Sequence, residues 1–268
     1  ELWNSGPFDP TVREGELYAR GSADDKGQVL IHFKSVEAFN NTYGTLPVNV
    51  KFLIEGEEEV GSPNLDDFVQ THQNLLQSDV VMISDTTMFA RNVPSICYGL
   101  RGLAYFQIDA QGASTDLHSG SFGGTVVNPA FELAVLLASM KDAHGRVAIP
   151  HFYDDVSELT ERERHEFAQL PFDAESYKND IGIKDLPGET GYSPLERLWA
   201  RPTLEVNGLL SGFTGEGAKT VLPAQAMAKI SMRLVPNQDP DKIGDLFEDY
   251  VRSVAPFSID VNLTRMHG

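Results

Sequence analysis

Acidic residues gather in three short clusters, each placed where a strand is expected to end. They are Asp24-Asp25, the run Glu55–Glu59 and Asp85. The carboxyl ends of parallel strands meet at one edge of a sheet, so we expect the three clusters to lie close together. Carboxylates packed there repel one another unless a cation lies between them. The spacing therefore indicates a divalent metal site, and histidine ligands in addition would favour zinc.

Taken singly, each cluster has an ordinary structural interpretation. Asp24-Asp25 before a helix is typical of an N-cap that also favours the helix dipole. A glutamate run is typical of a solvated helix start, and Asp85 alone indicates nothing. Carboxylates at strand ends also suit Mg²⁺ and phosphoryl transfer. That alternative is the weaker one, because the sequence has no Gly-x-x-x-x-Gly-Lys-Ser/Thr loop.

The first hundred residues alternate between strand and helix patterns, as expected of the elements that would position these acids. Strands are predicted at 16–19, 48–54, 80–83 and 95–100, with helices from Gly27 to Tyr43-Gly44 and from Ser62-Pro63. Such alternation predicts a mostly parallel α/β sheet.

From Gly102 onward the pattern changes to a second domain. Its expected elements are strands at 103–110, 204–213, 226–234 and 258–264, with helices starting at Asn128-Pro129 and Asp239-Pro240. The order β-α-β-β-α-β is that of a ferredoxin-like α+β unit. A polar insertion at about 145–203, with a helical stretch near 157–169, interrupts it. We therefore predict two domains, 1–101 and 102–268.

Composition excludes several classes of partner. The 268 residues carry 21 Lys and Arg against 39 Asp and Glu, a net charge of −18. A chain this acidic has no basic face for nucleic acid or for acidic membranes, and no apolar run approaches the ~20 residues of a membrane span. The single cysteine, Cys97, cannot form a disulfide within the chain, so we expect a reducing, cytoplasmic location.

Several longer segments resemble the co-catalytic zinc metallopeptidases, a family that includes carnosinase, cytosolic non-specific dipeptidase, carboxypeptidase G, aminoacylase and succinyl-diaminopimelate desuccinylase. The likeness is strongest to the dipeptidase branch and runs the length of the chain. The segments that carry it are Tyr18–Gly27, Glu55–Ser62, Ser84-Asp85, His118–Gly124, Gly217–Pro223, Arg233–Asn237 and His267-Gly268.

The resemblance implies a role for each acidic cluster. Asp24 corresponds to the carboxylate that bridges two Zn²⁺ ions, with Mn²⁺ or Co²⁺ able to substitute. Glu59 and Asp85 correspond to terminal metal ligands, and Glu58 to the general base. The implied reaction is hydrolysis of a peptide or amide bond in dipeptides or N-acyl amino acids. The resemblance also implies a non-proline cis peptide between Asp24 and Asp25.

Other matched residues are implied to bind substrate from a lid. His118 corresponds to a histidine that reaches the active site of the partner subunit and steadies the oxyanion. Thr220 and Arg233 correspond to residues that hold the C-terminal carboxylate of the substrate, and His267 to a further substrate-side position. The fold implied is a partial doubly wound, mostly parallel catalytic sheet plus a ferredoxin-like lid that forms a homodimer.

Two zinc-binding histidines of the family pattern have no match in the chain. We expect one before residue 1 and the other after residue 268, so that the sheet of the first domain is incomplete and the segment alone hydrolyses little. The alternative is a non-catalytic segment that acts through its dimerising lid. The intact Asp24, Glu58 and Glu59 favour an enzyme.

Overall fold

The computed structural model describes residues 3–268, which belong to two compact units, Glu1–Tyr98 and Gly99–Gly268. We call them unit 1 and unit 2. Within residues 3–268, no helix combines the length and the apolar character that crossing a membrane requires.

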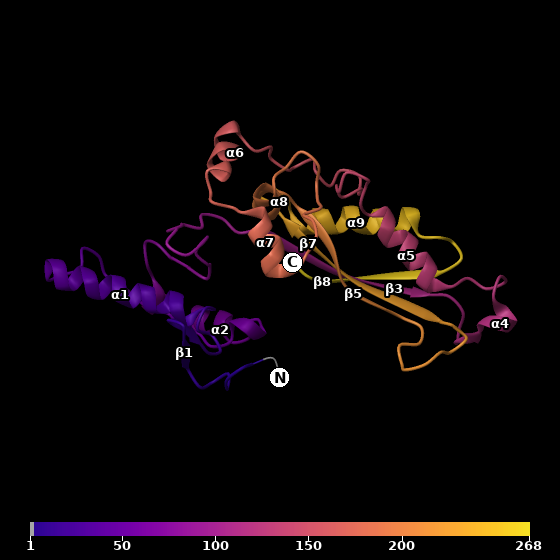
Figure 1. The fold of residues 1–268 in the computed structure, drawn as a ribbon, viewed down its shortest axis with the longest axis horizontal. Helices are drawn as coiled ribbons and strands as arrows, with labels where there is room; N and C mark the ends of the chain where they lie inside the picture. Colours follow the sequence, from indigo (N-terminus) through magenta and orange to yellow (C-terminus); the bar gives the residue numbers. More distant parts are fainter. Residues whose placement is uncertain (1–2) are drawn as a thin grey trace. The chain divides into compact units, whose positions relative to one another are not determined.

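Unit 2 is built on a four-stranded antiparallel sheet with the order β5-β7-β3-β8 (Figure 1). The strands are β3 (Gly102–Gln111), β5 (Thr203–Ser211), β7 (Gln225–Leu234) and β8 (Asp260–His267). Helices α5 (Pro129–Ser139) and α9 (Pro240–Val254) connect them in the chain order β3-α5-β5-β7-α9-β8. This order is the ferredoxin-like unit, so the fold predicted for the second half of the chain is confirmed.

One face of this sheet holds the core of unit 2 against α5 and α9. Alternate residues of β3 and β7 point to that face, and Ile108, Ile230 and Phe247 have no exposed surface. The rings of Phe106 and Phe247 lie 4.7 Å apart, centroid to centroid. Both helices begin as predicted: the Asn128 side chain accepts the backbone N–H of Ala130, and Asp239 caps α9 in the same way.

Two additions extend unit 2 beyond the sheet. We call β4 (Leu117–His118), α4 (Ser119–Phe122) and β6 (Val221–Leu222) the tip; β4 pairs with β6. The insertion at 145–203 carries α6 (Glu161–Ala168), α7 (Ala174–Ile181) and α8 (Pro194–Ala200). Near its start, Val147, Ile149 and Phe152 are buried in the core of the sheet, so the insertion is part of the packed unit.

A buried ion pair holds the insertion together. Arg201 donates to both carboxylate oxygens of Glu189 at 2.7 Å, and both side chains are almost fully buried. The Arg201 guanidinium also lies 4.2 Å from the ring centre of Tyr192. Charges at this depth are tolerated only when they are paired and hydrogen-bonded. This pair therefore joins the first residue of the segment 189–201 to its last.

Unit 1 contains helices where the sequence predicts them. Its elements are β1 (Thr11–Arg13), β2 (Glu16–Tyr18), α1 (Lys26–Tyr43), the 3-10 turn η1 (Glu58–Val60), α2 (Leu65–Thr71) and α3 (Gln73–Leu76). Helix α1 ends at Gly44, which adopts a left-handed conformation with φ 74°. The predicted strand near 16–19 is present as β2, paired with β1.

The other strand predictions in unit 1 are wrong: residues 48–54, 80–83 and 95–100 form no strand in the part of the chain that the structure describes. All four residues of Val80–Ile83 are 76–81% exposed. A strand forms only when its backbone groups pair with a neighbouring chain, and these segments find no such partner. The segment 48–54 still lies near α1, because Phe33 stacks on Phe52 with ring centres 4.6 Å apart.

Candidate functional site

Side chains of helix α1 contact the loops of two of the acidic clusters. The side-chain amide of Gln28 donates to the carbonyl of Ala23 at 2.7 Å and to the carbonyl of Thr86 at 3.2 Å. One turn further along, Nε2 of His32 lies 2.5 Å from Oγ of Ser84. The loops that carry Asp24 and Asp85 are therefore fixed to the same face of one helix.

The carboxylates of the three clusters influence one another. The pKa of Glu58 is raised, first by desolvation and then by the negative charges of Asp85, Glu59 and Asp24, with a further contribution from Glu55. Negative neighbours raise a carboxyl pKa because they disfavour its charged form. The structure therefore brings the predicted base and the three predicted metal ligands into electrostatic contact.

Local contacts distinguish the glutamates of the second cluster. Both carboxylate oxygens of Glu57 accept from the side-chain amide of Asn64, at 3.0 and 2.9 Å. Glu59 lies 3.9 Å from the guanidinium of Arg20. Glu58 begins η1 and has no such cationic or amide neighbour among the hydrogen bonds and ion pairs of the described residues. The position of Glu58 thus leaves its carboxylate available as a base.

The Asp24–Asp25 peptide is cis, as the resemblance implied. Asp25 occupies the N-cap position of α1, but its side chain makes no capping hydrogen bond. The interpretation of this pair as a side-chain helix cap is therefore not supported.

The carboxylates of the acidic clusters are of the type that binds divalent cations, but they are not arranged around a single ion position. Within residues 3–268, no group of three or more His, Cys, Asp or Glu side chains is placed to chelate a single ion. The carboxylates of Asp24, Glu59 and Asp85 are exposed, Glu59 in the turn η1 and the two aspartates in loops. They would fit a metal as hard donors, and a cation among them would relieve the repulsion felt by Glu58.

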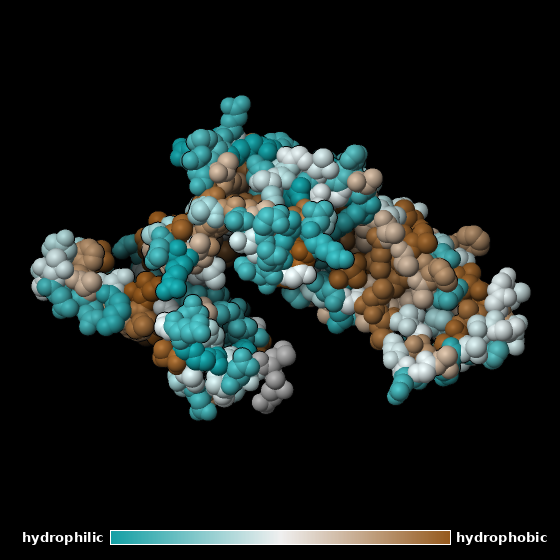
Figure 2. Space-filling model, in the orientation of Figure 1, coloured by the Kyte–Doolittle hydropathy of each residue, from teal (hydrophilic) through white to brown (hydrophobic). Residues whose placement is uncertain are grey.

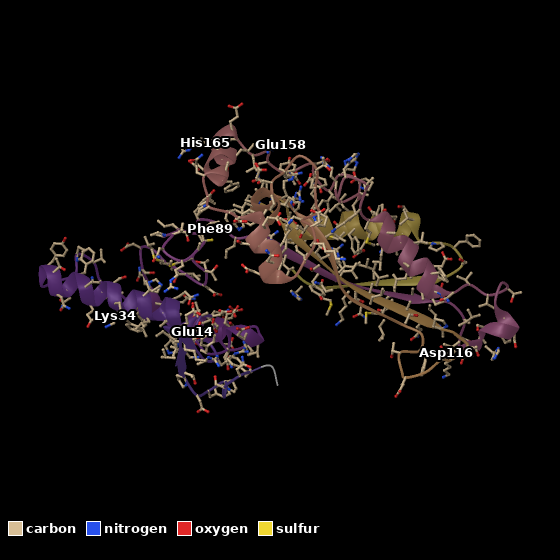
Figure 3. All side chains as sticks on the ribbon, viewed as in Figure 1. Glu14, Lys34, Phe89, Asp116, Glu158 and His165 are labelled. Carbon is tan, nitrogen blue, oxygen red and sulfur yellow. The ribbon has the colours of Figure 1, made fainter. Side chains whose placement is uncertain are left out.

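In unit 2, the tip brings His118 and Thr220 together although 102 positions separate them in the chain. Nε2 of His118 lies 3.2 Å from Oγ1 of Thr220, and Nδ1 accepts the backbone N–H of Gly120 at 3.0 Å. The pairing of β4 with β6 places them so, and Oδ1 of Asp116 accepts the N–H of Ala224 at the base of the tip (Figure 3).

Arg233 and His267 lie on the opposite face of the sheet from the helices. Arg233 on β7 is paired with Leu103, and His267 on β8 with Tyr105, whose ring stacks on the imidazole at 5.2 Å. Paired residues of antiparallel strands share a face. Burial lowers the pKa of the nearby Arg101 guanidinium, and the positive charge of Arg233 lowers it further. The two guanidinium groups are therefore near enough for their positive charges to interact.

The two pairs of predicted substrate residues occupy opposite ends of the sheet (Figure 1). Arg233 is level with Leu103 at the start of β3, whereas the tip continues beyond Gln111 at its end. That stretch of β3 measures roughly 27 Å at about 3.4 Å per residue. A dipeptide spans only about 7 Å. One chain therefore cannot place His118 and Arg233 on the same small substrate.

Sequence reasoning missed the residues whose role comes from a neighbour in space. Gln28 and His32 could have been noted as polar residues four apart on α1. Arg101 gave no signal, because its partner Arg233 lies far along the chain. Gly120 was noted only as part of a longer motif, and its contact with the His118 ring depends on the local backbone.

Comparisons with known proteins identify the family of the chain. A family model described as a peptidase dimerisation domain matches residues 98–258. The chain is 37% identical over 239 residues to a Beta-Ala-His dipeptidase of Homo sapiens, covering 88% of this chain and 47% of that protein. It is 36% identical over 259 residues to the Cys-Gly metallodipeptidase dug1 of Schizosaccharomyces pombe, covering 94% and 54%.

A solved structure gives the same result for the fold. The M20 family metallo-carboxypeptidase Sso-CP2 from Sulfolobus solfataricus superposes with a TM-score of 0.81 at 37% identity, over 97% of this chain and 59% of that one. The chain thus spans about half the length of the curated relatives it matches.

Proposed function

Because the chain belongs to the M20 peptidase family, in its dipeptidase branch, we propose that the protein hydrolyses the peptide bond of dipeptides or related N-acyl amino acids. The observation that carries the proposal is that Gln28 of α1 hydrogen-bonds both the loop of Asp24 and the loop of Asp85, and that the charges of these acids and of Glu59 act on Glu58. A carboxylate that acts as the general base must lie near the bond to be hydrolysed, and a metal must be surrounded by several carboxylates. This arrangement supports both.

Asp24, Glu59 and Asp85 would hold the metal, which we propose to be two Zn²⁺ ions, with Mn²⁺ or Co²⁺ able to substitute. When bound, the metal would supply Lewis-acid polarisation of the scissile carbonyl and acidify the attacking water. Glu58 would accept a proton at its carboxylate and return it to the leaving amine.

Unit 2 would recognise the substrate. Arg233 offers a two-pronged donor to the C-terminal carboxylate of a peptide, and Arg101 adds positive charge beside it. His267 lies on the same face next to Tyr105. At the tip, the His118 imidazole would donate to the oxyanion and Thr220 to a substrate oxygen. These assignments follow the resemblance, and the geometry of each pair supports them.

A homodimer would unite the two ends of unit 2. Since roughly 27 Å of β3 separates Arg233 from the tip, His118 of one copy would serve the site of the other. The surface for this contact is offered by α5 and β5. Phe131 and Val135, four apart on α5, are exposed, as is Leu209 on the edge strand β5. Figure 2 shows apolar side chains gathered over this part of unit 2.

The remaining aspects of the proposal concern the whole protein. We propose that further metal ligands come from parts of the protein outside residues 1–268, and that this segment alone hydrolyses little. We also propose a cytoplasmic location, since residues 1–268 contain only Cys97 and can form no disulfide among themselves. The charge of −18 argues against nucleic acid and acidic membranes as partners.

The experiment that tests this function is an assay of the full-length protein with Zn²⁺ or Mn²⁺ against a panel of dipeptides and N-acyl amino acids. We expect hydrolysis by the wild type and its loss in Glu58→Gln, with metal content unchanged. Glu57→Gln is the matched control, because Glu57 is held by Asn64, and it should retain activity. Hydrolysis retained in Glu58→Gln would contradict the base assignment, and an inactive wild type would favour the non-catalytic alternative.

A further inference from the structure

The imidazole of His118 is held by contacts at both of its nitrogens. Nδ1 lies 3.0 Å from the backbone nitrogen of Gly120, and Nε2 lies 3.2 Å from Oγ1 of Thr220. The tip that carries the ring is fixed at its base by the Asp116–Ala224 hydrogen bond. The ring is exposed, so these contacts define its orientation.

The contact with Gly120 decides where the ring proton lies. A backbone N–H can only donate, so Nδ1 must accept and cannot carry a proton of its own. The neutral imidazole therefore carries its proton on Nε2. In the structure the Nε2–H donates to the Thr220 oxygen, so this single N–H would exchange Thr220 for the substrate oxyanion, and the hydroxyl proton of Thr220 is free to donate elsewhere. A ring in this state offers a donor at Nε2 and no lone pair for a metal.

Gly120 permits this arrangement because it has no side chain. A Cβ at this position would lie 2.8 Å from Cε1 and 3.1 Å from Nδ1 of His118. Contacts below 3.0 Å essentially do not occur for real side chains, so one of the two must move. The ring is the end of an exposed, rotatable side chain, and it would move in preference to the backbone.

We propose that Gly120 is a positioning residue for His118: its backbone N–H and its lack of a side chain fix the imidazole as an Nε2–H donor. This inference rests on the proposed function for its catalytic consequence, but not for its structural content. The tautomer and the ring position are properties of the tip itself, whatever the protein hydrolyses.

The first test measures the tautomer directly. The protein is labelled with ¹⁵N-histidine, and the shifts of the two ring nitrogens are recorded at about pH 9, where an ordinary imidazole is neutral. The signal absent from His118→Asn identifies His118. We expect the proton on Nε2 in the wild type and a changed tautomer mixture in Gly120→Ala. Ser121→Ala, in the same short helix, should leave the signal unchanged.

The second test is a double-mutant cycle on the full-length protein. The Asn side chain in His118→Asn can still accept the Gly120 N–H but has no donor in place of Nε2–H. Loss of one oxyanion donor lowers kcat by about 10²–10³-fold, and a displaced donor by roughly 10²-fold. If Gly120 acts through His118, Gly120→Ala should have no further effect in the His118→Asn background.

Three outcomes would overturn the inference: a wild-type proton on Nδ1, an unchanged His118 signal in Gly120→Ala, or independent multiplication of the two kinetic effects. A structural role of Gly120 alone would give the last of these. If the wild type hydrolyses no amide at all, the proposed function fails, but the tautomer measurement still decides the present inference.

Discussion

Glu57 and Glu58 are adjacent and identical in type, yet their surroundings differ. Glu57 is held by both hydrogen bonds from Asn64, whereas Glu58 has its pKa raised by desolvation and by the acids around it. The sequence alone could identify the run Glu55–Glu59 as chemically interesting. The choice of Glu58 within it came from the resemblance, and the contacts of Glu57 now supply a physical reason.

At Arg233 we predict a loss of recognition of the substrate carboxylate. Arg233→Met removes a charge-assisted pair worth about 1.5–3 kcal/mol, which lowers kcat/KM for a dipeptide roughly 10- to 150-fold. Steady-state kinetics on a dipeptide and its C-terminal amide measure this. The amide should lose little on mutation, since it has no carboxylate to recognise.

Arg233→Lys separates charge from geometry at the same position. Lys keeps the charge but not the planar fork, so it should recover only part of the loss. Equal losses for the dipeptide and its amide would contradict the assignment of Arg233 to the carboxylate. The role of Arg101 could not be predicted, because its proximity to Arg233 arises from the fold of unit 2.

Among the elements, those with local signals were predictable. The residues Asn128-Pro129 and Asp239-Pro240 predict the starts of helices α5 and α9. Apolar alternation predicts the strands of unit 2. The strands expected at 48–54 and 80–83 failed for a different reason. Their composition favours β structure, but a strand depends on a partner that sequence composition does not supply.

The insertion at 145–203 offers a prediction about stability. Glu189→Gln leaves the Arg201 charge buried without a carboxylate, which should lower the free energy of unfolding by about 3–5 kcal/mol. Urea titration followed by fluorescence of Trp199, at the end of α8 and in ring contact with Phe167, reports on this region.

Glu166→Gln is the control for that measurement. It removes an ion pair of the same type with Arg162, but both side chains are exposed, so the expected change is below about 1 kcal/mol. Similar effects of the two substitutions would show that the Glu189–Arg201 pair does not hold the insertion in place.

At the scale of the whole molecule, the exposed apolar residues of unit 1 carry a prediction. Val80–Ile83 are 76–81% exposed, and backbone that lacks ladder partners exchanges its amide protons quickly. We expect fast hydrogen exchange at 80–83 in the segment 1–268 and protection in the full-length protein. The amides of β3 in unit 2 should be protected in both. Equally fast exchange at 80–83 in the full-length protein would contradict the view that this segment pairs as a strand with parts of the protein outside residues 1–268.

The resemblance already implied that His118 serves the site of the partner subunit, but the distance between His118 and Arg233 within one chain could not be predicted from the sequence. The register of β3 with β7 places them at opposite ends of the sheet, and a small substrate cannot span that length. This is the strongest reason to expect an active site shared between two copies of the chain.

The most direct test of a shared active site is therefore complementation between two inactive variants of the full-length protein. Glu58→Gln and His118→Asn should each be inactive on a dipeptide when assayed alone. In a mixed dimer, one site combines an intact Glu58 with an intact His118 from the partner. We predict that co-refolding equal amounts restores about one quarter of wild-type activity, since half of the dimers are mixed and each has one complete site. A mixture that forms mixed dimers and stays inactive would contradict the account.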